Sequence, residues 1–322
     1  MKFKWLTLLS AAAIALAPTV GAQAADKFPS KPLKVIIPFD PGDTDNMLRP
    51  VLDRMSEFLE QPVVLDYKPG AGGGIGANMV ASSDPDGYTL VGTSPGSIVV
   101  VPLANKDIQY STDDFEPVAA FSEGGLMLVV PSKSRWKSLK DMVEYSKDHP
   151  DEITFTSSGA LGITHLLAEA FTDTANIKWR HIPYKGSAPA ITALLGGHVD
   201  MASTAIAPAQ AHIQAGTLTP LAVFGDTRLK AYPDVPTLKE LGYDIGSPTY
   251  YGISAPAGTP PEVVNAIYEA AQKVVDKYEA DISKTLSTFG AQIKLLSPQE
   301  YKAYLGEQKK LFTTAVENLD EE

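Results

Sequence analysis

The segment ITFTSSGALGITHLLAEAF, residues 153–171, decides the fold of this chain. It reads as a strand over Ile153–Thr156, a turn of small hydroxyl residues and glycines over residues 157–162, and a helix from about Ile163. Such a turn leaves backbone N–H groups free at a helix N-terminus, where the helix dipole favours an anion. A strand followed directly by a helix also indicates an α/β fold.

A second turn of the same construction lies near the N-terminus. There an apolar strand over Leu33–Pro38 leads into the turn FDPGDTD, residues 39–45, and a helix starts around Asn46. A single turn of this kind is common in α/β proteins. Two of them, without a nucleotide-binding lysine motif, indicate a receptor that closes two lobes around a small anion.

The first residues have the features of an export signal. Lys2 and Lys4 precede the apolar run Leu6–Ala17, and Ala22-Gln23-Ala24 fits a cleavage site. The apolar run is too short to span a bilayer. We therefore predict that residues 1–24 are removed as a signal peptide and that the protein works outside the cytoplasm.

The composition narrows the function class. Loss of Lys2 and Lys4 takes the formal charge from −11 to −13, which disfavours a nucleic acid or an anionic membrane as partner. The sequence has no cysteine, so it offers no disulfide, no thiolate nucleophile and no cysteine metal site. Removal of the first 24 of 322 residues leaves about 298, a length that suits two lobes.

Strand-like and helix-like stretches alternate along most of the chain, which predicts largely parallel sheets with helices on both faces. The expected strands are Val63–Tyr67, Tyr88–Thr93, Leu126–Pro131, Ile153–Thr156, Lys178–Ile182, Val199–Ser203 and Leu218–Phe224. The expected helices are Leu48–Leu59, Ile75–Ser82, Leu139–Lys147, Ile163–Asp173, Ala188–Leu195 and Pro208–Ala215. A long amphipathic helix after Pro260, a short strand Gln292–Leu296 and a last helix from Ser297 follow.

A glycine-rich stretch, Gly70–Gly76, follows one of these strands. Its Gly72-x-Gly74-x-x-Ala77 spacing fits a relaxed dinucleotide fingerprint. NAD is scarce outside the cytoplasm, and no P-loop lysine follows. We interpret the stretch as a connection that lets strand and helix pack closely.

The histidines give only weak support for a metal site or a hydrolase active site. His165 and Glu169 have a spacing that can place two metal ligands on one helix face, but no third ligand is evident, so His165 is interpreted as a capping or pocket-lining residue. A Ser–His pair near His165 would be needed for a hydrolase, yet no G-x-S-x-G elbow or acidic third member is found. The remaining histidines, His149, His181, His198 and His212, are interpreted as surface or edge residues.

Eight segments, in order, are similar to one family. They are Pro29–Leu33 with Pro38-Phe39, Pro69–Gly73, Asp86–Leu90, His165-Leu166 with Glu169-x-Phe171, Pro183–Gly186, Gly196-Gly197-x-Val199-Asp200, Pro233–Thr237 and Ala255–Pro260. The whole chain after the signal resembles the substrate-binding receptors of tripartite tricarboxylate transporters, also called TctC or Bug proteins.

This resemblance implies a periplasmic, two-lobed α/β protein with the type II periplasmic-binding-protein fold: two doubly wound sheets joined by a two-strand hinge. The expected lobes are residues 26–125 plus 249–322, and residues 126–248. The implied ligand is a small organic anion, a mono- or dicarboxylate, with aromatic acids and amino acids included. The implied partners are membrane permease subunits, with no nucleic acid, cofactor or metal, and we expect a monomer without enzymatic activity.

The resemblance also implies where the ligand binds, namely the first strand–helix loop and the Ser/Gly loop, to which residues at the ends of other strands are added by the switch-point rule. The candidate ligand-binding residues are Phe39, Pro41, Gly42, Asp43, Thr44, Asp45, Thr93, Ser94, Ser157, Ser158, Gly159, Gly162, Thr164, His165, Tyr184, Ser203 and Thr204. Phe39, Trp179, Tyr250 and Tyr251 could line an apolar pocket, although most aromatic residues belong to a core.

The first loop departs from the family pattern Pro-Phe-x-Pro-Gly-Gly-x-x-Asp. It is one residue shorter, and Asp43 stands near the position of the second glycine. Asp43 either caps the helix, the commoner use of Asp at such a place, or faces the ligand and repels a carboxylate.

Two other functions of the protein stay open: a periplasmic sensor subunit with the same ligand site, and an exported α/β hydrolase.

Overall fold

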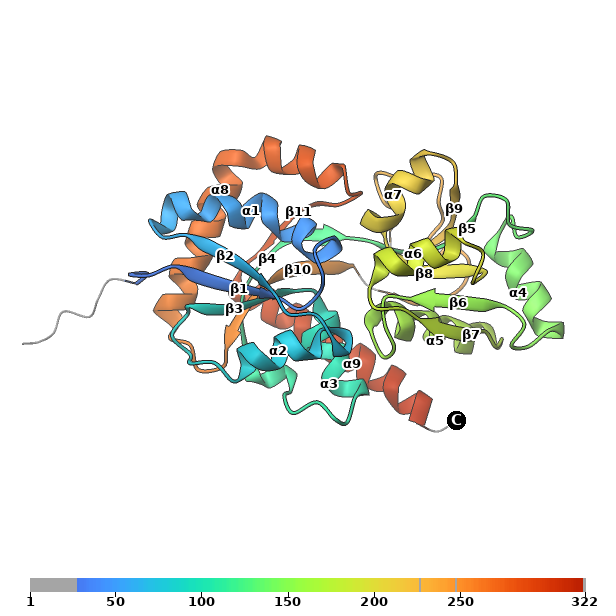
Figure 1. Cartoon of the computed structure of the whole chain (residues 1–322), viewed down its shortest axis with the longest axis horizontal. Helices are drawn as coiled ribbons and strands as arrows, with labels where there is room; N and C mark the ends of the chain where they lie inside the picture. The colour runs from blue at the N-terminus through green and yellow to red at the C-terminus, as the bar shows by residue number, and fades with distance from the viewer. Residues whose placement is uncertain (1–27, 226, 247, 321–322) are drawn as a thin grey trace, which may run out of the picture.

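The computed structural model describes residues 28–225, 227–246 and 248–320. These residues form a six-stranded and a five-stranded sheet, each packed against helices. Figure 1 shows the two sheets in separate halves of the molecule. We call the half with the six-stranded sheet lobe 1 and the half with the five-stranded sheet lobe 2. The predicted signal peptide lies outside the described residues.

Lobe 1 holds both ends of the described chain. Its strands are β1 (Leu33–Ile37), β2 (Val63–Tyr67), β3 (Thr89–Thr93), β4 (Phe115–Gly124), β10 (Thr249–Pro256) and β11 (Gln292–Leu296). Its α-helices are α1 (Asp43–Leu59), α2 (Gly74–Ala81), α3 (Val101–Ala104), α8 (Pro261–Ser287) and α9 (Pro298–Asp320). Three shorter turns are η1 (Ala71–Gly73), η2 (Gly96–Val100, π-helical) and η3 (Thr112–Asp114).

Lobe 2 is one continuous stretch between two crossings of the chain. Its strands are β5 (Leu126–Pro131), β6 (Thr154–Ser157), β7 (Arg180–Pro183), β8 (Met201–Ala205) and β9 (Leu218–Phe224). Its helices are α4 (Leu139–Asp148), α5 (Ile163–Ala175), α6 (Ser187–Leu195) and α7 (Ile206–Gln214).

The sheets are mixed rather than largely parallel. The strand orders are β11-β4-β10-β3-β1-β2 and β7-β6-β8-β5-β9. β1 is parallel to β2 and β3, and β6 is parallel to β7 and β8, but β5 and β10 pair antiparallel with both of their neighbours. The prediction of largely parallel sheets is therefore wrong for these strands. β5 and β10 enter their lobes from the other lobe, so they run against the strands that end at the boundary.

Apolar side chains on both faces explain why these sheets are covered on two sides. In β1, Val35 and Ile37 face a core that contains Met47 of α1 and Ile267 of α8. Ile36 faces the opposite core, with Ala77 of α2. A strand buried on both faces has this near-continuous apolar sequence. The parallel strands are thereby fixed with their carboxyl ends at one edge of the sheet.

Helix α9 joins the two lobes. Its first half packs in lobe 1, where Tyr301 and Leu305 are buried. Farther along, Phe312 is only 1% exposed and belongs to the lobe 2 core that also contains Leu166 and Phe171 of α5. Figure 1 shows α9 running from under lobe 1 toward lobe 2. Within the described residues, no helix is both long and apolar enough to cross a membrane.

Candidate functional site

The carboxyl ends of three parallel strands in each lobe lie at the boundary between the lobes. In lobe 1 these strands are β2, β1 and β3, and in lobe 2 they are β7, β6 and β8. Ligands of open α/β sheets bind at such edges. The boundary between the two edges is therefore the candidate site.

Loops from the two edges lie close together. A β-carbon placed on Gly72, after β2, would lie 3.9 Å from the carbonyl oxygen of Ala160, in the loop after β6. One placed on Gly96, after β3, would lie 3.5 Å from the Cγ2 atom of Ile163, the first residue of α5. These loops of the two lobes therefore lie next to each other across the boundary.

A second contact closes the boundary near the crossings. The Gln210 side chain of α7 donates a hydrogen bond of 3.4 Å to the Ser287 carbonyl at the end of α8. Ala207 of α7 packs against the lobe 1 core. The backbone N–H of Ile206 donates to the carbonyl of Gly125, the residue between β4 and β5. The start of α7 is thus tied both to lobe 1 and to the first crossing.

Asp45 caps α1 and holds the first loop. Its Oδ1 accepts a 2.5 Å hydrogen bond from the N–H of Gly42, and its Oδ2 accepts from Tyr67 Oη at 2.9 Å and from Arg49 Nε at 3.2 Å. Gly42 is the N-cap, with a φ of 153° that a residue with a side chain rarely adopts. Both carboxylate oxygens of Asp45 accept hydrogen bonds from lobe 1 residues, so Asp45 fixes the conformation of the first loop.

Asp43 is free of the capping role because Gly42 and Asp45 fill it. Its Oδ2 accepts a hydrogen bond of 2.9 Å from the hydroxyl of Tyr251 in β10. Burial raises the pKa of Asp43 to about 6, and the charge of Asp45 adds to this effect while the Tyr251 hydrogen bond opposes it. Of the two roles that the sequence left open for Asp43, the structure therefore rules out the cap.

The other residues of the first loop differ in exposure. Pro41 is exposed, Gly42 borders open space and Thr44 is buried. Phe39 is half-buried, and a β-carbon on Gly73 would lie 3.0 Å from its ring. The Phe39 ring therefore packs against the glycine-rich turn at Gly73, where a side chain would have no room.

Thr93 and Ser94 close the turn after β3. The Thr93 hydroxyl donates to the Ser94 carbonyl at 3.0 Å and shares a hydrogen bond of 2.5 Å with the hydroxyl of Ser97. The Ser97 carbonyl in turn accepts from the Tyr110 hydroxyl. Ser97 was not predicted from the sequence. Its place four residues after Thr93, at the start of a helical turn, is the signal that could have identified it.

In the Ser/Gly loop, hydroxyl groups bond mainly to the loop itself. The Ser157 hydroxyl donates to the Gly159 carbonyl at 3.0 Å, and the N–H of Ser158 donates to Thr164 Oγ1 at 3.1 Å. The hydroxyls of Ser158 and Thr164 are 2.8 Å apart. These bonds fix the loop before any ligand arrives, which reduces the entropy lost on binding.

His165 locks the same loop from the first turn of α5. Its Nδ1 accepts a hydrogen bond of 3.1 Å from the N–H of Leu161, and its Nε2 is 3.1 Å from Oε1 of Glu169. The hydrogen bond from Leu161 to His165 accompanies a φ of 58° at Leu161, a strained value for a bulky residue. Among the described residues, no group of three or more His, Cys, Asp or Glu side chains could hold a metal ion.

His181 is part of this cluster, and the sequence placed it only as a surface or edge residue. It lies on the edge strand β7, but its ring stacks on both Phe155 and His165, with ring centroids 4.8 and 3.8 Å away. Its Nε2 is 2.7 Å from the Ser157 hydroxyl. Burial, with a contribution from His165, lowers the pKa of His181 to about 3. The register of β6 with β7, which places His181 beside Phe155, was the missing information.

The helices that start at the lobe 2 edge lack side-chain caps. The N-caps of α5, α6 and α7 are Gly162, Gly186 and Ala205, none of which has a side-chain oxygen. By contrast, α4 starts away from the boundary, and Ser138 caps it by accepting from the N–H of Asp141. Uncapped N–H groups and the helix dipole attract an anion, so this edge has a positive field although no candidate residue is Lys or Arg.

Ser203 and Thr204 lie at the end of β8 between these helices. Both are fully buried. The Thr204 hydroxyl donates to the Ala205 carbonyl at 3.1 Å, whereas the Ser203 hydroxyl has no hydrogen-bond partner among the described residues. A buried hydroxyl without a partner costs free energy, which a polar ligand or a water molecule would recover.

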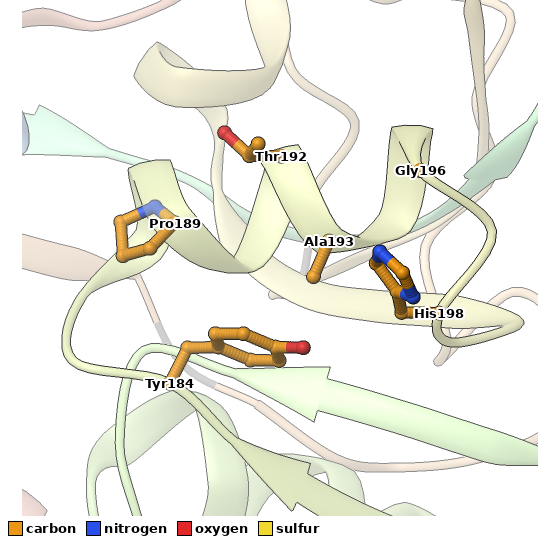
Figure 2. Close-up of a pocket in the computed structure, with 6 residues that line it drawn as sticks. All are labelled: Tyr184, Pro189, Thr192, Ala193, Gly196 and His198. Carbon is orange, nitrogen blue, oxygen red and sulfur yellow. The ribbon is translucent and has the colours of Figure 1, made fainter.

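Tyr184 is placed differently from the other candidates. Its backbone N–H donates to the Ser157 carbonyl, but its ring lies in a hollow of about 580 Å³ with Pro189, Thr192 and Ala193 of α6. Figure 2 shows this ring extending beneath α6 toward His198. Every residue that lines this hollow belongs to lobe 2, so it is not the site between the lobes.

Comparisons with known proteins identify the family of this chain. The model of the tripartite tricarboxylate transporter family receptor (TctC) matches residues 47–320. The UPF0065 protein in the gbd 5' region of Cupriavidus necator is 34% identical over 310 residues, covering 96% of this chain and 93% of that protein. Protein BugT of Bordetella pertussis is 33% identical over 306 residues, covering 92% and 91%.

Solved structures show the same fold. A periplasmic transporter protein has a TM-score of 0.84 and 35% identity, covering 90% of this chain and 97% of that one. MatC from Rhodopseudomonas palustris, solved with bound malate, has a TM-score of 0.82 and 26% identity over 90% and 100%. A second R. palustris protein, solved with adipate, has a TM-score of 0.80 and 27% identity over 90% and 97%.

Proposed function

The chain belongs to the tripartite tricarboxylate transporter receptor family, and solved relatives are periplasmic binding proteins. We therefore propose that it captures a small organic carboxylate between its lobes and delivers it to a tripartite membrane transporter. One observation carries this proposal most directly. Three helices with uncapped N-termini start at one edge of lobe 2, and the first residue of one of them, Ile163 of α5, lies beside Gly96 of lobe 1. The solved relatives with malate and adipate support a carboxylate as ligand.

In this proposal, the carboxylate lies against the N–H groups at the starts of α5 and α6, and the hydroxyls of Ser158, Thr164 and Ser203 complete its hydrogen bonds. From lobe 1 the ligand meets the first loop and the turn after β3. Contacts to both lobes stabilise the closed form over the open one, so ligand shifts the population toward closure.

We place the hinge at the two crossings of the chain. The first is Gly125, between β4 and β5, and the second precedes β10. We propose lobe boundaries at these crossings, which gives residues 26–125 plus 249–322 and residues 126–248, as the family resemblance implies. Opening would separate Gly72 from Ala160 and break the hydrogen bond of Gln210 with Ser287. The permease would then distinguish the closed, loaded receptor from the open one.

A hydrolase is the competing function because Ser157 and His181 form a Ser–His hydrogen bond. Several features argue against catalysis. Ser157 is fully buried, and its hydroxyl donates to Gly159. His181 has a pKa of about 3, far below the range of an effective general base at neutral pH. Among the described contacts, no carboxylate orients the His181 ring. We therefore propose binding without turnover.

The test is a thermal-unfolding panel of organic acids. At a ligand concentration one hundred times Kd, mass action stabilises the folded protein by about 2.7 kcal/mol, which shifts the melting temperature measurably. Thr164→Val should weaken the effect of the best acid, because it removes the hydroxyl that holds Ser158. Thr174→Val is the matched control, since Thr174 is an exposed residue at the other end of α5. A panel without any stabilising acid would contradict the proposal.

Delivery is tested separately from binding. Uptake of the identified acid, in radiolabelled form, is measured in cells that express a tripartite permease with and without this protein. Uptake that requires the protein supports transport. Binding without any effect on uptake would instead favour the sensor function.

A further inference from the structure

The Asp43 carboxylate carries a charge that the fold does not require. The cap of α1 is made by Gly42 and Asp45. The Tyr251 hydroxyl needs an acceptor, but a neutral amide oxygen would serve equally well. Neither the helix start nor the packing of Tyr251 therefore explains why this side chain is an acid.

Asp43 is not paired with a cation, unlike its neighbour. Asp45 is paired with Arg49 at 3.2 Å, whereas no ion pair to Asp43 occurs among the described residues. The carboxylate of Asp43 is also partly desolvated, and a charge in that position is costly unless a partner compensates it. In a receptor, the bound ligand is available to be that partner.

Asp43 lies where the two lobes meet. The Tyr251 ring stands beside Gly124, the last residue of β4, since a β-carbon on Gly124 would lie 2.8 Å from that ring. Tyr251 also belongs to the core against which Ala207, near the start of α7, packs from lobe 2. A ligand held at the lobe 2 edge therefore has Asp43 on its lobe 1 side, near the crossing.

The two sides of the site thus have opposite character. The lobe 2 edge offers uncapped helix N-termini and the unpartnered hydroxyl of Ser203, while the lobe 1 side offers an unpaired acid. We infer that Asp43 selects ligands that combine a carboxylate with an ammonium group, so that amino acids bind in preference to di- and tricarboxylates. This inference rests on the proposed function and names the ligand class of the same site.

The experiment uses four acids of similar length that differ in their end groups: butyrate, succinate, 2-aminobutyrate and 4-aminobutyrate. Titration calorimetry is carried out on the full protein and on two variants. Asp43→Asn keeps an acceptor for Tyr251 but removes the charge. Asp40→Asn removes the same charge from an exposed position in the same loop and is the control.

For the native protein, we expect one of the two aminobutyrates to bind on the order of tenfold more tightly than succinate or butyrate. In Asp43→Asn, the preference of about tenfold for the aminobutyrate over succinate and butyrate should disappear. The variant should also bind succinate more tightly than the native protein does. Asp40→Asn should keep the native order. Circular dichroism and melting curves check that both variants are folded.

Failure of the inference differs from failure of the proposed function. If no acid in these four or in the wider panel binds, the receptor function itself is wrong. If acids bind, but a di- or tricarboxylate binds more tightly than its amino analogue and Asp43→Asn brings no gain, the receptor function stands and Asp43 does not select the ligand. Equal effects of Asp43→Asn and Asp40→Asn would also overturn the inference, since they would show a general charge effect.

Discussion

The imidazole ring of His165, on α5, stacks on the ring of His181, on β7, with 3.8 Å between the ring centroids. His165 holds the N–H of Leu161 and His181 contacts the hydroxyl of Ser157, so the pair fixes the Ser/Gly loop at its first residue and near its end. The loop is thereby held by residues that do not need to touch the ligand.

The buried His181 should make folding sensitive to acid. Its pKa is about 3 in the folded protein and 6.5 as the ordinary value, so below about pH 6.5 the unfolded chain binds a proton that the folded chain does not. The free energy of unfolding should fall by up to about 1.4 kcal/mol per pH unit from this group as the pH is lowered toward 3. Urea unfolding of the native protein, His181→Phe and His198→Gln measures this. His181→Phe should flatten the slope, whereas His198→Gln, at an exposed position, should leave it unchanged.

Asp43 should have the opposite pH dependence. Its pKa is raised from 3.8 to about 6, so between these values the folded protein holds a proton that the unfolded chain has released. The contribution to stability is therefore present at low pH and is lost as the pH rises through about 6. Asp43→Asn should be more stable than the native protein at pH 8 by about 1–3 kcal/mol, with no difference near pH 4. A difference that is constant with pH would contradict the raised pKa.

The Ser/Gly loop and the glycine-rich loop should respond differently to alanine. Ser158→Ala removes a hydroxyl that lies at the candidate site beside Thr164, and loss of a hydrogen bond to a charged ligand costs about 1.5–3 kcal/mol, or at least tenfold in affinity. In Gly74→Ala, the new methyl group meets the Ile108 side chain, so packing changes while the site does not. Calorimetric affinities of the two folded variants decide this. A larger loss of affinity in Gly74→Ala would place the site in the other loop.

Helix α9 should contribute to the stability of lobe 2. Phe312 is buried in the lobe 2 core, so Phe312→Ala should lower the free energy of unfolding by about 3–5 kcal/mol. Leu311→Ala, at the neighbouring position, is the control: Leu311 is 43% exposed and should change stability by no more than about 0.5 kcal/mol. Equal losses in the two variants would mean that α9 does not dock on lobe 2.

The sequence predicted elements well where the local pattern agrees with the fold. β2, β5, β9 and β11 have the predicted bounds, and α5 starts at Ile163 as expected. β4 and β10 were not predicted as strands. β4 contains Pro117 with Glu116 and Ser122, and β10 contains Gly252, so neither has a clear strand pattern. Both are strands because they pair with each other across more than a hundred residues, which no local pattern reveals.

For the candidate site, the sequence predicted which backbone turns form it, but not which side chains contact each other there. The turns after β1 and β6 were located from their small residues, but the partners of Asp43 and Ser157 come from distant parts of the chain. Tyr251 reaches Asp43 from 208 residues away, and His181 reaches Ser157 only because β6 and β7 pair. The two roles left open for Asp43 could be separated only once Asp45 was seen to form the cap.

The central claim is that the protein binds a small carboxylate between its lobes and releases it unchanged. The most direct measurement is titration calorimetry with the best acid of the panel, followed by denaturation of the complex and chemical identification of the recovered ligand. The account predicts saturable binding of one acid per chain, weakened by Ser158→Ala, and complete recovery of the intact acid. An acid that is consumed, or binding that Ser158→Ala and Thr164→Val both leave unchanged, would contradict it.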